Sequence, residues 1–191
     1  DIESDWDLSH QDLPPANGHN IPLIYGDLYS YTDAGGVRSI DHGTGVLGIV
    51  VGANNTILSL GITPNLTTTM VASYWIYDPG QSKYVPDRPN AISRAISNLT
   101  AGDVLLLEMQ IDQDGLQHLP VEYDYYVFHA IQLGTMAGRI VVEAAGNGGH
   151  NLDDLPIFVP WLVRASGIND SGAILVSAAT SGLPHQPMTV A

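Results

Sequence analysis

A histidine within a glycine-rich segment is the first residue whose type and setting could support chemistry. The segment is Asp41-His42-Gly43-Thr44-Gly45-Val46-Leu47-Gly48. An imidazole is the side chain that most often accepts and returns a proton near neutral pH, and it needs a rigid element to hold it. Glycines at 43, 45 and 48 would let a helix pack tightly in the interior. The pattern favours His42 as a general base at the start of a buried helix, although a histidine that only caps a core helix has the same pattern.

An asparagine directly after an apolar run is the second candidate. The run Ile140-Val141-Val142-Glu143-Ala144-Ala145 leads into Gly146-Asn147-Gly148-Gly149. A carboxamide fixed at the end of a strand can donate an N–H to a carbonyl oxygen on which negative charge develops during acyl transfer. Taken alone, an asparagine among glycines is also typical of an ordinary turn.

Together the two segments resemble the subtilisin-like serine proteases, or subtilases. In that family His-Gly-Thr opens a helix, a Gly-x-x-Pro turn leads into a strand, and Ala-Ala-Gly-Asn carries the oxyanion-hole residue. The turn is matched here by Gly61-Ile62-Thr63-Pro64, whereas Gly45 stands where the family usually has a second histidine. The resemblance implies a three-layer α/β/α fold with a mainly parallel sheet, a serine endopeptidase activity, and catalytic roles for His42 and Asn147.

The carboxylate that orients the histidine should come from the beginning of the chain. The segment Glu3-Ser4-Asp5-Trp6-Asp7-Leu8-Ser9-His10-Gln11-Asp12-Leu13 resembles the family's Asp-x-Gly followed by His-Pro-Asp-Leu. Anchoring the match at residues 10–13 puts Glu3 at the position of the acid, and a Glu can take this role in related triads. Asp1 is the alternative, Asp5 replaces the family's glycine, and a solvated acidic loop is the non-catalytic interpretation.

The nucleophilic serine of the family, in Gly-Thr-Ser-x-Ala-x-Pro, has no match in this chain. Gly134-Thr135-Met136-Ala137 imitates it, with Met136 at the serine position, but precedes Asn147. We therefore expect residues 1–191 to be a single peptidase domain that is C-terminally incomplete and inactive by itself. Two alternatives stay open: a non-catalytic, subtilase-like binding module, and a glycosidase that uses Glu108 and Glu143 as its carboxylate pair.

A further resemblance concerns the strand on which the family pairs its substrate. The run Val104-Leu105-Leu106-Leu107 leads into Glu108-Met109-Gln110, where the family usually has Ser-Leu-Gly. Backbone groups do most of the pairing when a peptide adds to a strand edge. Glu108, Met109 and Gln110 are therefore the candidate substrate-binding residues.

The elements that position these residues follow from apolar patterning. Continuous apolar runs predict strands over 67–75, 103–109, 139–144 and 173–178, and such runs are typical of parallel strands covered on both faces. Apolar residues at helical spacing predict helices over 88–99 and 121–138. The segment 1–7 is interpreted as a loop that follows a missing strand. These alternating elements favour an α/β class with a parallel sheet.

Composition narrows the functional class. The 191 residues include 20 acidic and 6 basic residues, for a net charge of −14, and no cysteine. The negative net charge disfavours binding to nucleic acids and anionic membranes. The absence of cysteine excludes thiolate chemistry. We expect protein or peptide substrates, an inhibitory propeptide as a further partner that the family allows, and secretion. No cofactor and no catalytic metal is expected, although a family-type structural calcium ion would find oxygens at Asp153 and Asp154.

Overall fold

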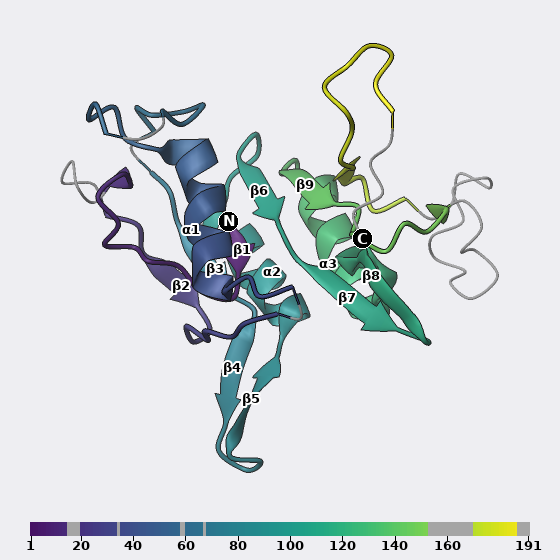
Figure 1. Cartoon of the computed structure of the whole chain (residues 1–191). Coiled ribbons are helices and arrows are strands. Elements are labelled where there is room, and N and C mark those ends of the chain that lie inside the picture. The colour runs from purple at the N-terminus through teal and green to yellow at the C-terminus, as the bar shows by residue number, and fades with distance from the viewer. Residues whose placement is uncertain (15–19, 34, 58–59, 67, 153–169, 187–191) are drawn as a thin grey trace. The chain divides into compact units, whose positions relative to one another are not determined.

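The computed structural model (Figure 1) describes residues 1–14, 20–33, 35–57, 60–66, 68–152 and 170–186. The chain divides into two compact units, Asp1–Ala95 and Ile96–Ala191. Within these residues, each unit has three parallel strands, helices and one antiparallel hairpin. The α/β class with a mainly parallel sheet is therefore confirmed.

The first unit has its parallel strands in the order β1-β3-β2. β1 pairs with β3 in the register Ile2↔Ala72 and Glu3↔Ser73. A separate hairpin, β4–β5, is antiparallel. The bounds are β1 Ile2–Glu3, β2 Leu23–Tyr25, α1 Ser39–Val51, β3 Val71–Ser73, β4 Trp75–Asp78 and β5 Lys83–Pro86, followed by α2 Arg88–Asn98, which ends in the second unit.

Helix α1 has one buried stripe. Ser39, Gly43, Leu47 and Val51 recur every four residues and are all buried. This spacing places their side chains on one face of the helix. Leu47 and Val51 contribute to a core cluster that also includes Trp6, Leu13, Ile21 and Val71. The stripe fixes the rotation of α1 and therefore decides where the other residues of the helix point.

The second unit has its parallel strands in the order β6-β9-β10, with Val104↔Ile140 and Ile174↔Val142 in register. Helix α3 begins after Asp124, whose carboxylate accepts from the backbone N–H groups of Tyr126 and Val127. The bounds are β6 Val104–Leu107, β7 Gln110–Gln113, β8 Leu116–Pro120, the 3₁₀ turn η2 Val121–Tyr123, α3 Tyr125–Met136, β9 Ile140–Ala144 and β10 Ile174–Val176.

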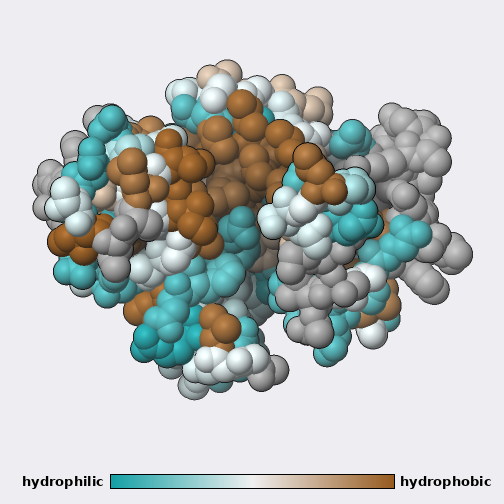
Figure 2. Space-filling model, turned by 45° about the horizontal axis from the view of Figure 1, so that its top comes forward, coloured by the Kyte–Doolittle hydropathy of each residue, from teal (hydrophilic) through white to brown (hydrophobic). Residues whose placement is uncertain are grey.

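The second unit buries alternate side chains of its strands. Leu105 and Leu107 on β6 and Val141 on β9 are at most 2% exposed. The first residues of the three strands, Val104, Ile140 and Ile174, are instead exposed. Figure 2 shows apolar side chains, coloured brown, gathered on one face of the protein. One face of this sheet is therefore well covered while apolar atoms of the strand starts meet solvent.

Most predicted elements are present, with shorter bounds. The strands expected over 103–109, 139–144 and 173–178 are β6, β9 and β10, and the one expected over 67–75 is β3, with residue 67 outside the described residues. The helix expected over 88–99 is α2, and the one over 121–138 divides into η2 and α3 because Asp124 adopts an extended conformation and caps α3.

The interpretation of segment 1–7 as a loop after a missing strand is wrong. Ile2–Glu3 is itself a strand, β1, which pairs with β3 in parallel orientation. Two residues are too few to show an alternating pattern, so the sequence does not predict this strand. The correction matters because Glu3 lies at the end of a strand, at the edge where parallel sheets collect functional groups.

Candidate active site

Glu3 and His42 lie in direct contact in the first unit. The Oε1 atom of Glu3 is 2.6 Å from Nδ1 of His42. The Glu3 side chain is 6% exposed and the His42 side chain 49% exposed. A carboxylate accepts only, so Nδ1 carries the proton of the neutral imidazole, and Nε2 is the ring atom whose lone pair can take up a further proton. The pair has the geometry of a general base with its orienting acid.

Helix α1 begins at Ser39 and not at His42 as expected. Three residues of the first turn precede the histidine, and Arg38 beside it forms an exposed ion pair with Asp41. His42 falls outside the buried stripe of α1, so its side chain faces solvent on one side and Glu3 on the other. The helix expected to be buried is buried along this stripe alone, and the His42 side chain is accessible to solvent.

The residue after the histidine lets α1 approach β1. A Cβ atom on Gly43 would lie under 3.0 Å from the backbone oxygen of Asp5 and from the ring of Trp6. Only glycine permits that approach. The hydroxyl of Thr44 accepts from the backbone N–H of Asp7 at 2.8 Å. Gly43 and Thr44 therefore hold the helix against the segment that follows Glu3, which explains the His-Gly-Thr sequence in physical terms.

Asp1 and Asp5, the two carboxylates nearest to Glu3 in sequence, bond elsewhere. Asp1 Oδ2 accepts from the indole N–H of Trp6 at 2.9 Å. Asp5 Oδ1 accepts from the backbone N–H of Trp6 at 2.9 Å. Of the two acids that the sequence left open, the structure brings Glu3 and not Asp1 to the imidazole.

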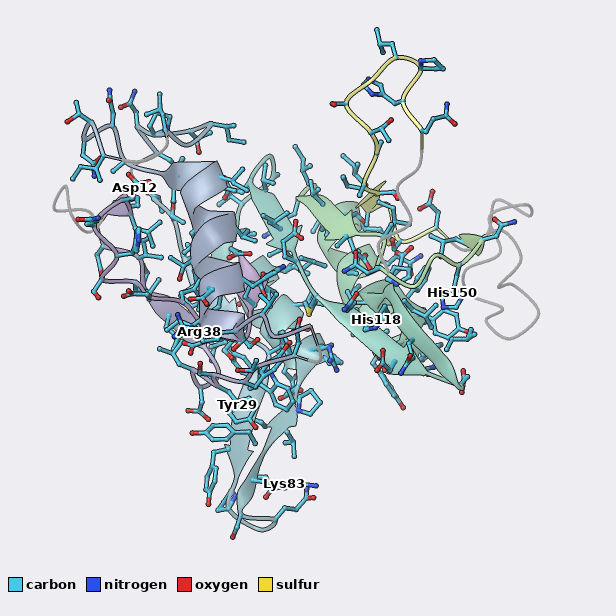
Figure 3. The ribbon with its side chains drawn as sticks, viewed as in Figure 1. Asp12, Tyr29, Arg38, Lys83, His118 and His150 are labelled. Atoms are coloured by element: carbon cyan, nitrogen blue, oxygen red, sulfur yellow. The ribbon has the colours of Figure 1, made fainter. Side chains whose placement is uncertain are left out.

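Aromatic side chains lie close to Ser4, the residue that follows Glu3. The Ser4 hydroxyl is 3.4 Å from the hydroxyl of Tyr74, which is 3.3 Å from that of Tyr31. Burial raises the pKa of Tyr74 well above its ordinary value, and the nearby Tyr31 adds to the shift. Tyr29 packs on Trp75 and Tyr84 of the hairpin β4–β5, with its ring labelled in Figure 3. These rings stabilise a hairpin that would be marginal alone.

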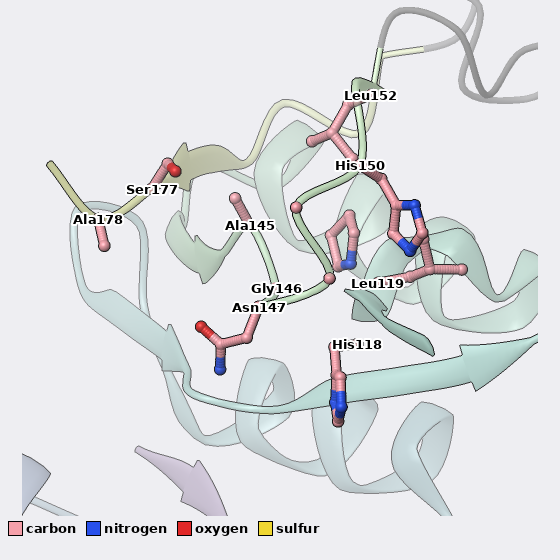
Figure 4. A pocket seen from close by; sticks show the side chains of 12 residues that line it. His118, Leu119, Ala145, Gly146, Asn147, His150, Leu152, Ser177 and Ala178 are labelled. Carbon is pink, nitrogen blue, oxygen red and sulfur yellow. The ribbon is translucent and has the colours of Figure 1, made fainter. Parts of the chain in front are cut away.

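Asn147 lies in the second unit, in the loop that follows β9. Its backbone N–H donates to Oε1 of Gln110 at 3.3 Å. A pocket of about 150 Å³ adjoins it, bounded by residues 118–120, 145–150, Leu152 and 177–178 (Figure 4). The loop stands at the carboxyl end of β9, where ligands of open parallel sheets bind. Its predicted role in stabilising an oxyanion stays a prediction.

The three candidate substrate-binding residues differ in accessibility. Met109 is 4% exposed, so its side chain is not available to a ligand. Glu108 and Gln110 are half-buried, and Gln110 is occupied by the Asn147 amide. This bond could not be predicted from local sequence, because it joins residues 37 positions apart.

The glycosidase alternative is disfavoured by burial. Glu143 is fully buried, and its Oε1 accepts from the backbone N–H of Glu122 at 2.9 Å. Glu122 is also buried and accepts from the hydroxyl of Ser171. A catalytic carboxylate must touch its substrate, so Glu143 serves instead to join β9 to the turn before α3.

No metal site emerges from the described residues, which hold no group of three or more His, Asp or Glu side chains close enough to bind an ion. Asp153 and Asp154, the candidates for a structural calcium ion, lie outside the described residues. Among the helices that the structure describes, none is long and apolar enough to cross a membrane.

Comparison with known proteins finds a distant relative. The chain is 31% identical over 149 residues to the nisin leader peptide-processing serine protease NisP of Lactococcus lactis subsp. lactis. The match covers 73% of this chain and 20% of that protein, so the chain spans about a fifth of the relative's length. No protein-family model matches the chain. The chain is thus distantly related to a serine protease.

Proposed function

We propose that the chain is part of a subtilisin-like serine endopeptidase that hydrolyses proteins or peptides through an acyl-enzyme. The observation that carries the proposal is the 2.6 Å contact between Glu3 Oε1 and His42 Nδ1. Glu3 would hold the imidazole in one tautomer and stabilise its protonated form, while Nε2 takes the proton of a serine. The similarity to a protease whose name gives a leader peptide as its substrate supports polypeptide substrates here.

The remaining parts of the mechanism are assigned by chemistry. Asn147 would donate to the oxygen of the tetrahedral intermediate after attack. The serine is not among the motifs of residues 1–191, so we propose that it is supplied by residues outside this segment. A secreted enzyme with an inhibitory propeptide is part of the same proposal, and so is the absence of a catalytic metal.

A serine-directed phosphonate tests the proposal on the full-length protein that contains this segment. The expected result is a covalent adduct on one serine, with loss of peptidase activity. The variant His42→Ala should label far more slowly, because its serine has no base, while Arg38→Ala, an exposed neighbour, should label normally. Cleavage of peptides without labelling would exclude the serine mechanism. Binding of peptides with neither labelling nor cleavage would favour the non-catalytic binding module.

A further inference from the structure

The hairpin β7–β8 is a rigid element beside the loop of Asn147. Its strands pair at Gln110↔Pro120 and Ile111↔Leu119. Asp114 and Gly115, both with positive φ, form the two-residue turn that suits a twisted hairpin. Leu119 is fully buried against Tyr123, with Ile111, Leu116 and Leu152 packed around them. The hairpin is therefore anchored in the core of its unit.

Strand β8 of the hairpin is bent at His118. This residue has φ +56°, a left-handed conformation that residues with a side chain rarely adopt. The bend is held by Asp112, whose Oδ1 accepts from the His118 backbone N–H at 2.8 Å. Pairing of the two strands is irregular between Ile111 and Gln113, next to the same carboxylate. Such a conformation persists where surrounding contacts over-determine it, and it is frequent at functional sites.

The bend turns the hairpin backbone onto the Asn147 loop. The Gly148 N–H donates to the His118 carbonyl at 3.2 Å, and Nε2 of His150 donates to the Gln117 carbonyl at 3.1 Å. With the bond from the Asn147 N–H to Gln110, three hydrogen bonds connect the loop to both strands of the hairpin. Figures 3 and 4 show His118 and His150 on the two sides of this contact.

The glycines of the loop are required by this approach. A Cβ atom on Gly146 would lie under 3.0 Å from the His118 carbonyl oxygen, and one on Gly148 equally close to that of Gln117. Gly149, in contrast, has open space around it. Two of the three glycines around Asn147 are therefore explained by contact with the hairpin.

We propose that the hairpin β7–β8 positions the Asn147 loop for catalysis, with Gln110 as a positioning residue. The inference rests on the proposed function, because an oxyanion donor must be fixed before the charge develops. Gln110 fixes the backbone of the donor itself, and the Gln117–His118 backbone fixes the residues after it. Gln110 does not need to touch the substrate to affect the rate.

Amide hydrogen exchange on the 191-residue chain tests whether the hairpin holds the Asn147 loop, and it requires no enzymatic activity. In Gln110→Ala the Asn147 amide should exchange roughly tenfold faster, because its acceptor is lost. Gln113→Ala removes the same side chain from the other end of β7 and should leave that amide unchanged. Gln110→Glu keeps an acceptor oxygen and should preserve the protection. An Asn147 amide that exchanges equally in all three variants would overturn the inference. If Gln110→Ala fails to fold, Gln110→Leu, which also has no acceptor oxygen, takes its place with the same expected result.

A double-mutant cycle on the full-length protein tests the catalytic half. Gln110→Ala should lower kcat about tenfold with KM unchanged. A tenfold change corresponds to the loss of about one hydrogen bond, here the bond that holds the oxyanion donor in place. In an Asn147→Ala background the same change should have no further effect, because Gln110 acts through Asn147. An equal loss in both backgrounds would contradict the assignment. A full-length protein without any peptidase activity would refute the proposed function. The exchange experiment would still show whether the hairpin holds the Asn147 loop.

Discussion

Shortening Glu3 by one methylene tests the acid–base pair most sharply. Glu3→Asp restores the residue that subtilases usually carry, yet we expect it to impair this protein. The change withdraws the carboxylate by one C–C bond, about 1.5 Å. The Oε1 to Nδ1 contact, now 2.6 Å, would open to about 4 Å, beyond hydrogen-bond reach. Strand pairing of Glu3 with Ser73 holds the backbone in place, so β1 cannot follow.

The size of the effect follows from the bond that is lost. A hydrogen bond to a charged group contributes about 1.5–3 kcal/mol, which corresponds to a fall of roughly 10- to 100-fold in kcat/KM. Glu3→Gln keeps the length but removes the charge, and should cost roughly 10³- to 10⁴-fold, as in triads whose acid becomes an amide.

Kinetics of the full-length protein on a peptide substrate measure the rate. Proton NMR of the 191-residue chain measures the contact itself, because the His42 Nδ1–H should give a downfield resonance when it bonds to Glu3. Glu3→Asp with parental kcat/KM and an unchanged proton resonance would refute the reasoning. Loss of activity in Asp1→Ala but not in Glu3→Asp would transfer the role to Asp1.

Four other changes have expected outcomes. Asn147→Ala should lower kcat roughly 10²- to 10³-fold with little change in KM; equal activity of variant and parent in steady-state kinetics would remove the oxyanion role. Gly43→Ala should lower the free energy of unfolding by about 2 kcal/mol or more, measured with denaturant, because its Cβ meets the Asp5 backbone. Asp124→Ala should cost about 1 kcal/mol by the same measurement, since α3 loses its N-cap; an unchanged midpoint would contradict this. Burial and the Asp87 carboxylate raise the pKa of Tyr25 from 10 to about 12. The neutral phenol therefore contributes stability that is complete below pH 10 and is lost as the pH rises to 12, and Tyr25→Phe should remove this part of the alkaline dependence in pH-resolved melts.

The sequence predicted best what depends on neighbours along the chain. The apolar runs of β6 and β9 and the helical spacing of α2 are local patterns, and the bounds found differ by a few residues. The contact between Glu3 and His42 was predictable only because a family motif supplied the spacing; nothing local connects two residues 39 positions apart.

The sequence analysis missed the elements whose stability comes from tertiary contacts. Strand β1 has two residues and no pattern of its own. The hairpin β7–β8 did carry a signal, since Asp114-Gly115 between alternating residues is typical of a two-residue turn. The burial of Glu143 could not be foreseen, because a carboxylate in an apolar run gives no indication of what will bond to it.

The division of the chain into two units has a consequence for synthesis. Glu3, His42 and the glycine that lets them meet all belong to residues 1–95, whereas Asn147 belongs to the second half. Translation delivers the first unit from the ribosome before the second, and domains fold as units in that order. Under the proposed function, the residues of the Glu3–His42 pair are therefore synthesised before the Asn147 loop that would donate to the oxyanion. On this account, a newly made molecule would carry its proton acceptor before it carries the group proposed to stabilise the tetrahedral intermediate.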